Sequence, residues 1–105
     1  MNIILCCGNG FSTSIVVSKM QQEAKSQGKD HKIWAIPADM LKKDITKADV
    51  VLIGPHMVYR KAEIEKITSQ SDVPMGIIAA LDYGQGNGGN VLKQAEELFK
   101  KKGKV

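Results

Sequence analysis

Two short, uninterrupted apolar runs constrain the fold of this chain more than any other feature. Ile3-Ile4-Leu5 and Val50-Val51-Leu52-Ile53 place apolar side chains at successive positions. Because neighbouring side chains in a strand point to opposite faces, both faces of each run must be buried. Such strands are typical of central positions in a parallel sheet that helices cover on both sides. The two runs therefore predict an α/β fold.

The rest of the chain alternates between strand-like and helix-like segments. Val16, Met20 and Ala24 recur at helical spacing, and Gly28 suits the position just after a helix. This alternation predicts one domain over residues 1–105, with a single parallel sheet, helices on both faces and right-handed crossovers. We expect strands at 2–7, 33–36, 50–53 and 73–79, helices at 12–27, 38–47 and 55–69, and a last helix through 91–99. Their inward residues should include Met40, Leu41, Ile45, Met57, Ile64, Ile67 and Phe99.

Composition argues against export and against membrane insertion. The first apolar run stops at Gly8, and no stretch reaches the roughly 18 apolar residues of a membrane span. We therefore expect a cytoplasmic protein in which Cys6 and Cys7 stay reduced. The formal charge of +4 comes with few aromatic residues and no arginine cluster, which does not favour nucleic-acid binding.

The segment between the first strand and the first helix carries the candidate site, and it reads Cys7-Gly8-Asn9-Gly10-Phe11-Ser12-Thr13-Ser14. A strand, a glycine-containing turn and a helix start offer backbone N–H groups to an anion. The helix dipole should also lower the pKa of a cysteine at this place. No lysine or arginine precedes Lys19, so amide dipoles must do this work. We predict that Cys7 is a nucleophile and that Cys6, inside the strand, is packed and inert.

Polar residues follow two other predicted strands at the same edge of the sheet. Parallel strands end together, and ligands of such folds bind beyond those ends. His56 follows one strand, while Asp82 and Tyr83 follow another. We expect all three at the periphery of the Cys7 site. Capping or simple exposure is the alternative for His56, and a turn role is the alternative for Asp82.

Nucleotide and metal motifs are incomplete in this chain. Gly84-x-Gly86-x-x-Gly89 has the G-x-G-x-x-G spacing, but only 16 residues follow it, too few for a βαβ unit with a ribose-binding acid. We expect a flexible turn there, beside the Cys7 loop. The cysteines and histidines lack the spacing of known metal ligands, so neither a cofactor nor a metal is expected.

The segment from Cys7 to Ser14 resembles the phosphorylation loop of the IIB components of the phosphoenolpyruvate-dependent sugar phosphotransferase system. The likeness is to the lactose/cellobiose branch, whose loop reads C-x-x-G-x-S-T-S. It continues through Ser18-Lys19-Met20, through 49–55 with Tyr59, and through Tyr83-Gly84, and so spans nearly the whole chain. The resemblance implies a three-layer domain with a four-stranded parallel sheet in the order 2-1-3-4, a fold shared with low-molecular-weight tyrosine phosphatases.

The resemblance also implies a reaction. Cys7 would accept a phosphoryl group from a phosphohistidine of a IIA partner and pass the group to a sugar bound by a membrane IIC partner. The sugar would be a β-glucoside such as cellobiose or chitobiose. The protein would associate with the membrane through IIC without inserting into it. The loop residues Gly8, Asn9, Gly10, Phe11, Ser12, Thr13 and Ser14 would hold the phosphoryl oxygens, and Phe11, Met57 and Tyr59 are candidate contacts at the rim.

Two other functions remain open from the sequence. The phosphatases of this fold carry C-x5-R-S, and Thr13 stands in the place of their arginine. Loss of that bidentate clamp favours a carrier, because a carrier must hold its phosphocysteine without hydrolysing it. Asp82 keeps a phosphatase possible, since a carboxyl group could serve as general acid. A module that binds anions or responds to oxidation, without forming a stable phosphoprotein, is the third hypothesis.

Overall fold

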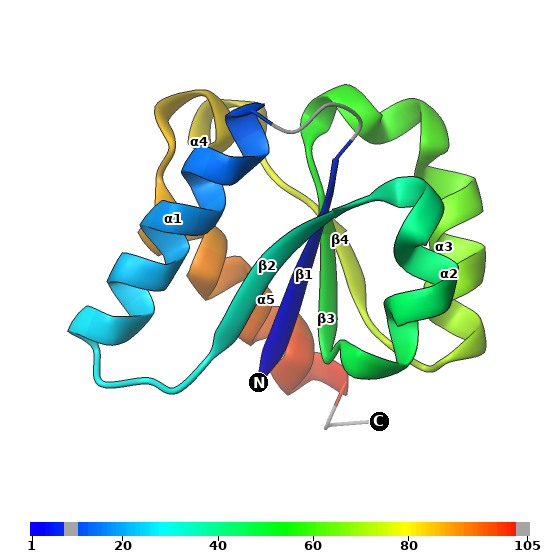
Figure 1. The fold of residues 1–105 in the computed structure, drawn as a ribbon, viewed down its shortest axis with the longest axis horizontal. Helices are drawn as coiled ribbons and strands as arrows, with labels where there is room; N and C mark the ends of the chain where they lie inside the picture. Colours follow the sequence, from blue (N-terminus) through cyan, green and yellow to red (C-terminus); the bar gives the residue numbers. More distant parts are fainter. Residues whose placement is uncertain (8–10, 103–105) are drawn as a thin grey trace.

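The computed structural model describes residues 1–7 and 11–102 of the chain (Figure 1). The strands are β1 (Asn2–Cys7), β2 (Lys32–Pro37), β3 (Val50–Ile53) and β4 (Met75–Ile77). The α-helices are α1 (Phe11–Ser26), α2 (Leu41–Asp44), α3 (Lys61–Gln70), α4 (Ala80–Gln85) and α5 (Gly88–Lys102). Three 3-10 helices, η1 (Ala38–Met40), η2 (Ile45–Lys47) and η3 (Pro55–Arg60), join them.

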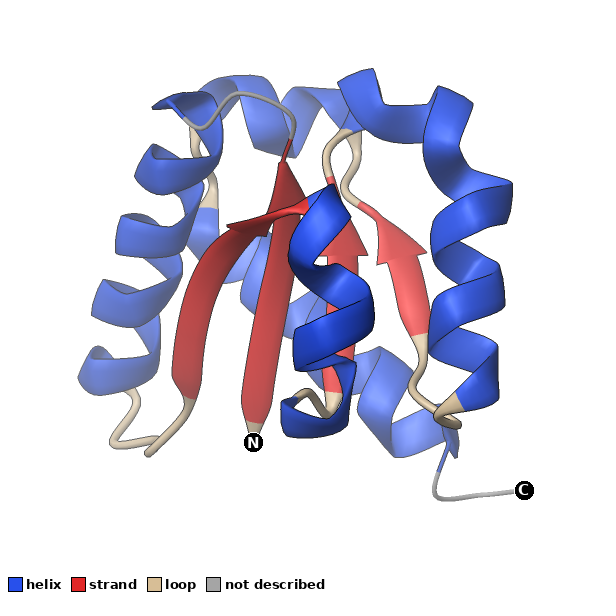
Figure 2. Ribbon diagram, turned by 45° about the vertical axis from the view of Figure 1, so that its right-hand side comes forward, coloured by secondary structure: helices blue, strands red, loops and turns tan. Residues whose placement is uncertain are grey.

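The strands form one parallel sheet in the order β2-β1-β3-β4, which confirms the predicted topology. β1 lies in the middle, where Leu5 is in register with Ala35 of β2 and with Leu52 of β3. Helices α1 and α5 cover one face, and α2 and α3 cover the other (Figures 1 and 2). All four strands end at the edge where η1, η3, α4 and the start of α1 lie (Figure 1).

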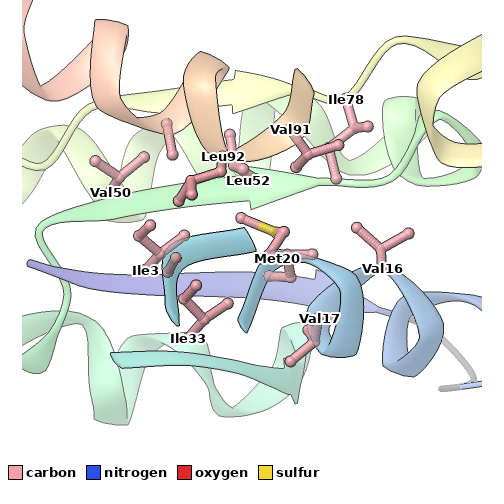
Figure 3. Close-up of a cluster of buried hydrophobic side chains, with 13 residues drawn as sticks. Ile3, Val16, Val17, Met20, Ile33, Val50, Leu52, Ile78, Val91 and Leu92 are labelled. Atoms are coloured by element: carbon pink, nitrogen blue, oxygen red, sulfur yellow. The ribbon is translucent and has the colours of Figure 1, made fainter. Parts of the chain in front are cut away.

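The alternation of side chains along β1 divides the core into two clusters. Ile3 and Leu5 pack with the buried residues of α1 and α5 (Figure 3). Ile4 and Cys6 pack on the other face, against α2 and α3. All four side chains are fully buried. A strand buried on both faces is what the uninterrupted apolar runs predict.

Most of the expected inward residues are buried, and two are not. The stripe of α1 is buried as predicted, and Gly28 after its end has a φ of 69°. Leu41, Ile45, Met57 and Ile64 are also buried, and Ile67 packs against the cluster under α3. Met40 and Phe99 were wrongly predicted to face inward, since they are 42% and 40% exposed. Met40 ends a 3-10 helix, whose tighter turn displaces side chains from α-helical spacing.

The prediction of a flexible glycine-rich turn over residues 84–89 is wrong. Residues 80–85 form helix α4, and α5 begins at Gly88, so only Gly86 and Asn87 remain between them. Gly86 has a φ of 62° and ends α4, while the Asn87 side chain accepts a hydrogen bond from the Asn90 N–H in the first turn of α5. The last strand is correspondingly shorter than predicted, at Met75–Ile77. The segment is thus two helices joined by a tight turn.

Candidate functional site

The candidate nucleophile lies where the central strand meets a helix. Cys7 is the last residue of β1, in register with Pro37, and α1 begins at Phe11. The backbone therefore passes from the strand to the first turn of a 16-residue helix within three residues. The N–H groups of that first turn have no partner within the helix, and the positive end of the helix dipole lies there. Gly8, Asn9 and Gly10 lie outside the described residues, and only the backbone of Cys7, Phe11 and Ser12 is described.

Cys6, by contrast, is at 0% exposure in the cluster on the α2 and α3 face. Its neighbours there are apolar, which is the environment of a packing residue. The burial of Cys6 agrees with its predicted structural role.

Thr13 has a buried hydroxyl that bonds across the site. Its side chain is 2% exposed, and its Oγ1 lies 2.9 Å from the Tyr83 hydroxyl oxygen, close enough for either group to donate. Ser14, one residue on, is exposed. The hydroxyls predicted to act together on a phosphoryl group therefore lie in different environments.

The Tyr83 ring, whose hydroxyl meets Thr13, is in tilted contact with the exposed imidazole of His56. Their ring centroids are 5.3 Å apart and their planes are inclined by 49°. Gly54, at the end of β3, leaves the space for both rings, because a Cβ there would lie 2.6 Å from His56 Cε1 and 3.1 Å from Tyr83 Cε2. Gly54 was not among the residues predicted from the sequence to belong to the site. Its place after an apolar run on the functional edge was the available signal for a packing role.

The other peripheral candidates lie elsewhere. Asp82 Oδ1 accepts a hydrogen bond of 3.0 Å from Asn90 Nδ2, which ties α4 to α5. Tyr59 on η3 is 79% exposed. Met57, expected as a possible rim contact or core residue, is buried at 1% exposure. The structure therefore groups Thr13, Tyr83 and His56, and gives Asp82 a partner at the helix junction.

A half-buried arginine, Arg60, ends η3 and is engaged by acids. Arg60 bonds with Glu63 Oε1 and Asp39 Oδ1, each at 2.9 Å. The hydrogen bond to Glu63, and next the one to Asp39, raise the pKa of the Arg60 guanidinium. Its charge is thus compensated locally. No lysine or arginine precedes Lys19 in the sequence, and the start of α1 contributes the positive end of its helix dipole near the end of β1.

Metal binding and membrane spanning receive no support from the described part of the chain. Within residues 1–7 and 11–102 there is no group of three or more histidine, cysteine or acidic side chains placed to hold a metal ion. Among the described helices, none combines the length and apolar character that crossing a membrane requires.

Comparison with known proteins identifies the family. The family model described as "PTS system, Lactose/Cellobiose specific IIB subunit" matches residues 2–94. The chain is 41% identical over 97 residues to the oligo-beta-mannoside-specific EIIB component of Bacillus subtilis, covering 92% of this chain and 94% of that protein. It is also 41% identical over 102 residues to the cellobiose-specific EIIB component of Lactococcus lactis, with the same coverage.

Solved structures agree with the sequence matches. The solution structure of the cellobiose-specific IIB component from Borrelia burgdorferi superposes with a TM-score of 0.83 at 39% identity, covering 97% of this chain and 94% of that one. The lactose-specific IIB domain from Streptococcus pneumoniae superposes with a TM-score of 0.84 at 8% identity, covering 93% of this chain and 96% of that one. At this identity the likeness shows the fold alone. With the sheet order, the strand-to-helix site and these matches together, the chain belongs to the lactose/cellobiose-specific IIB subunits of the phosphotransferase system.

Proposed function

We propose that this protein is a phosphoryl carrier in which Cys7 holds the transferred group. The observation that carries the proposal is the position of Cys7 at the end of the central strand, separated by three residues from the start of a long helix. That geometry suits an anion, since first-turn N–H groups and the helix dipole both stabilise negative charge. The family to which the chain belongs transfers phosphoryl groups to sugars, and Cys7 is the cysteine at this functional edge.

The proposed reaction has two displacements at phosphorus. The Cys7 thiolate attacks the phosphohistidine of a IIA partner, so an S–P bond forms, the N–P bond breaks, and the imidazole keeps the electron pair. The hydroxyl of a sugar bound by a membrane IIC partner then attacks the same phosphorus: an O–P bond forms, the hydroxyl proton passes to water, the S–P bond breaks, and the sulfur leaves as thiolate. The backbone N–H groups of residues 8–14 and the hydroxyls of Ser12 and Ser14 hold the phosphoryl oxygens. The transfer to the sugar takes place at the cytoplasmic face of the membrane, where this protein meets IIC.

Exposed apolar side chains on the elements that adjoin the strand ends support docking of the two partners. Val58 and Tyr59 on η3 are 49% and 79% exposed, Ile15 in α1 is 58% exposed, and Leu81 in α4 is 68% exposed. All four belong to elements at the edge where the strands end. Large apolar side chains that are exposed near a functional site are typical of protein interaction surfaces when they form a patch. We assign this edge to successive contacts with IIA and IIC.

We further propose a β-linked disaccharide of the cellobiose or chitobiose type as the sugar. The relatives at 41% identity are specific for cellobiose, for oligo-beta-mannosides and for galactose, and two of these three sugars are β-linked saccharides. Transfer from the phosphorylated protein to each sugar, in membranes that contain the IIC partner, identifies the acceptor. A preference for an unrelated monosaccharide would contradict this assignment.

Phosphorylation by purified phospho-IIA tests the carrier proposal directly. We expect label on Cys7, located by mass mapping, with the acid and alkali stability of a phosphothiol. Cys7→Ser should abolish labelling, because a serine hydroxyl is hardly ionised at neutral pH. Cys6→Ala is the matched control, since Cys6 is fully buried and should not take part. Wild-type labelling of Cys7→Ser would refute the assignment.

The phosphatase alternative predicts a different result in a simple assay. The only acid that the sequence offered for it, Asp82, is engaged with Asn90 at the junction of α4 and α5. We therefore expect negligible turnover of p-nitrophenyl phosphate. Rapid, Asp82-dependent hydrolysis would favour the phosphatase instead.

A further inference from the structure

Thr13 and Tyr83 form a hydroxyl pair that connects the start of α1 to α4. The two residues are 70 positions apart in sequence, and their oxygens are 2.9 Å apart. Thr13 is the third residue of α1, so it lies in the first turn, whose N–H groups lack partners within the helix. Because its side chain is only 2% exposed, its hydroxyl is turned away from solvent and is already engaged. Holding this side chain fixes the orientation of the turn.

Tyr83 is itself held from three directions. Its ring packs partly against the core cluster under α1 and α5. His56 covers the ring at a centroid distance of 5.3 Å, and Gly54 gives both rings room. Helix α4 is fixed to α5, because Asn90 Nδ2 donates to Asp82 Oδ1 and the Asn87 N–H donates to the Asp82 carbonyl oxygen at 2.8 Å. The hydroxyl of Tyr83 is therefore presented to Thr13 by a rigid support.

We propose that Tyr83 is a positioning residue for the Cys7 loop: its hydroxyl holds Thr13 and so aims the first-turn N–H groups of α1 at the end of β1. Thr13 then acts through its backbone and its bond to Tyr83, and the phosphoryl oxygens are left to the backbone N–H groups and to Ser12 and Ser14. The part of this inference that concerns phosphoryl transfer rests on the proposed carrier function.

A purely structural role is the competing explanation. Buried hydroxyls need partners, and a Thr–Tyr pair satisfies two of them whatever the function of the protein. The two explanations differ in one respect. A structural pair affects the stability of the whole fold, whereas a positioning pair also affects the acidity of the thiol that the oriented N–H groups stabilise.

Tyr83→Phe, which removes one oxygen and keeps the ring, separates the two explanations. The rate of Cys7 alkylation by iodoacetamide, measured from pH 5 to 9 in a Cys6→Ala background, gives the thiol pKa. We expect Tyr83→Phe to raise the pKa of the Cys7 thiol by about half a unit, which is the shift expected when a helix-dipole interaction is partly lost. Phosphorylation by phospho-IIA should slow by roughly fivefold, because small misplacements of the attacking group reduce the rate steeply.

Thr13→Val removes the other hydroxyl of the same hydrogen bond. It should therefore also raise the pKa of Cys7 and slow phosphorylation. The double variant should be no worse than either single one, as expected for one shared interaction. Thr13→Ser keeps the hydroxyl, so its Cys7 pKa and its phosphorylation rate should equal those of the wild type. Thr68→Val is the matched control, because Thr68 is also buried, at 1% exposure, and its hydroxyl donates to the Glu65 carbonyl oxygen in α3.

The outcomes are distinct. A lower melting temperature with an unchanged Cys7 pKa and an unchanged phosphorylation rate in both single variants would overturn the positioning role. If phospho-IIA does not label even the wild type, the carrier function fails, while the alkylation comparison still decides whether Tyr83 tunes the thiol. A shift in Thr68→Val equal to that in Thr13→Val would also overturn the inference, since the effect would then follow from general destabilisation.

Discussion

Gly88 at the start of α5 lies so close to α1 that a single methyl group should separate the two helices. A Cβ built on Gly88 would lie 2.3 Å from the carbonyl carbon of Lys19 and 2.6 Å from its carbonyl oxygen. Non-bonded carbon atoms prefer separations of about 3.5–4.0 Å, so Gly88→Ala requires a shift of about 1 Å. Because the obstacle is backbone, no change of rotamer relieves it.

The expected magnitude follows from two opposing effects. Overpacking a well-packed contact costs about 1–3 kcal/mol, and the shift would also loosen Val91 and Leu92, which are at most 1% exposed. Replacing glycine by alanine in a helix regains at most about 1 kcal/mol. We therefore expect Gly88→Ala to lose about 2 kcal/mol, which lowers the melting temperature by about 8–16 °C in a domain of this size.

Gly89→Ala is the matched control for this prediction. It is the next residue of the same helix, and a Cβ there would meet its nearest atom, Glu23 Cδ, at an ordinary 3.5 Å. Its stability should stay within about 0.5 kcal/mol of the wild type. Thermal and urea unfolding followed by circular dichroism measures both variants. Equal stability of the two variants would show that the approach of α5 to α1 is not constrained by Gly88.

Two further predictions concern α4 and the amino ends of the strands. Gly84→Ala should stabilise the protein by about 0.5–1 kcal/mol, since Gly84 is helical and a Cβ there has open space. Gly86→Ala should destabilise the protein, because Gly86 has a φ of 62°. Chemical denaturation of both variants measures whether the two changes in stability have opposite signs. Partial burial opposes ionisation of Glu96, but hydrogen bonds from Lys29 and His31 outweigh it and lower the pKa of the carboxyl group. A lowered folded-state pKa stabilises the protein above the unfolded-state value, and this contribution is lost as pH falls through and below about 4.5. Glu96→Gln should therefore flatten the acid limb of the stability profile, and an unchanged limb would exclude this ion pair as a source of acid sensitivity.

The topology could be predicted from the sequence because its determinants are local. Ile3-Ile4-Leu5 and the run over 50–53 are buried on both faces in the structure, as central strands must be. The stripe of α1 and the terminating glycine at position 28 are likewise local signals. The residue pattern of each segment indicates whether it forms a strand or a helix, and the rules for connecting parallel strands leave few possible sheet topologies.

Helix α4 could not be predicted, because contacts distant in sequence decide it. Four glycines over 84–89 favour a turn by propensity, yet Gly84 lies within α4 and Gly88 begins α5 against Lys19. The bond between Asp82 and Asn90 then fixes the junction of the two helices. Tertiary packing here overrides local propensity.

The candidate site was predictable in part for the same reason. Cys7 at the end of a strand before a helix is a local pattern, and the structure places the backbone of Cys7 there. The sequence grouped Thr13 with its hydroxyl neighbours and Tyr83 with Asp82. Which hydroxyl pairs with which is decided by the packing of α4 beside α1, so the bond between Thr13 and Tyr83 needed the fold to be seen.

The distance in sequence between Thr13 and Tyr83 sets an order of events during synthesis. Cys7 and the start of α1 leave the ribosome early, but the partner that orients this turn follows 70 residues later. A nascent chain released before α4 would carry the cysteine without the support that aims the amides at it. If Cys7 carries the phosphoryl group as we propose, its site is completed only by the last third of the polypeptide, and we expect chains that end before α4 to be poor acceptors.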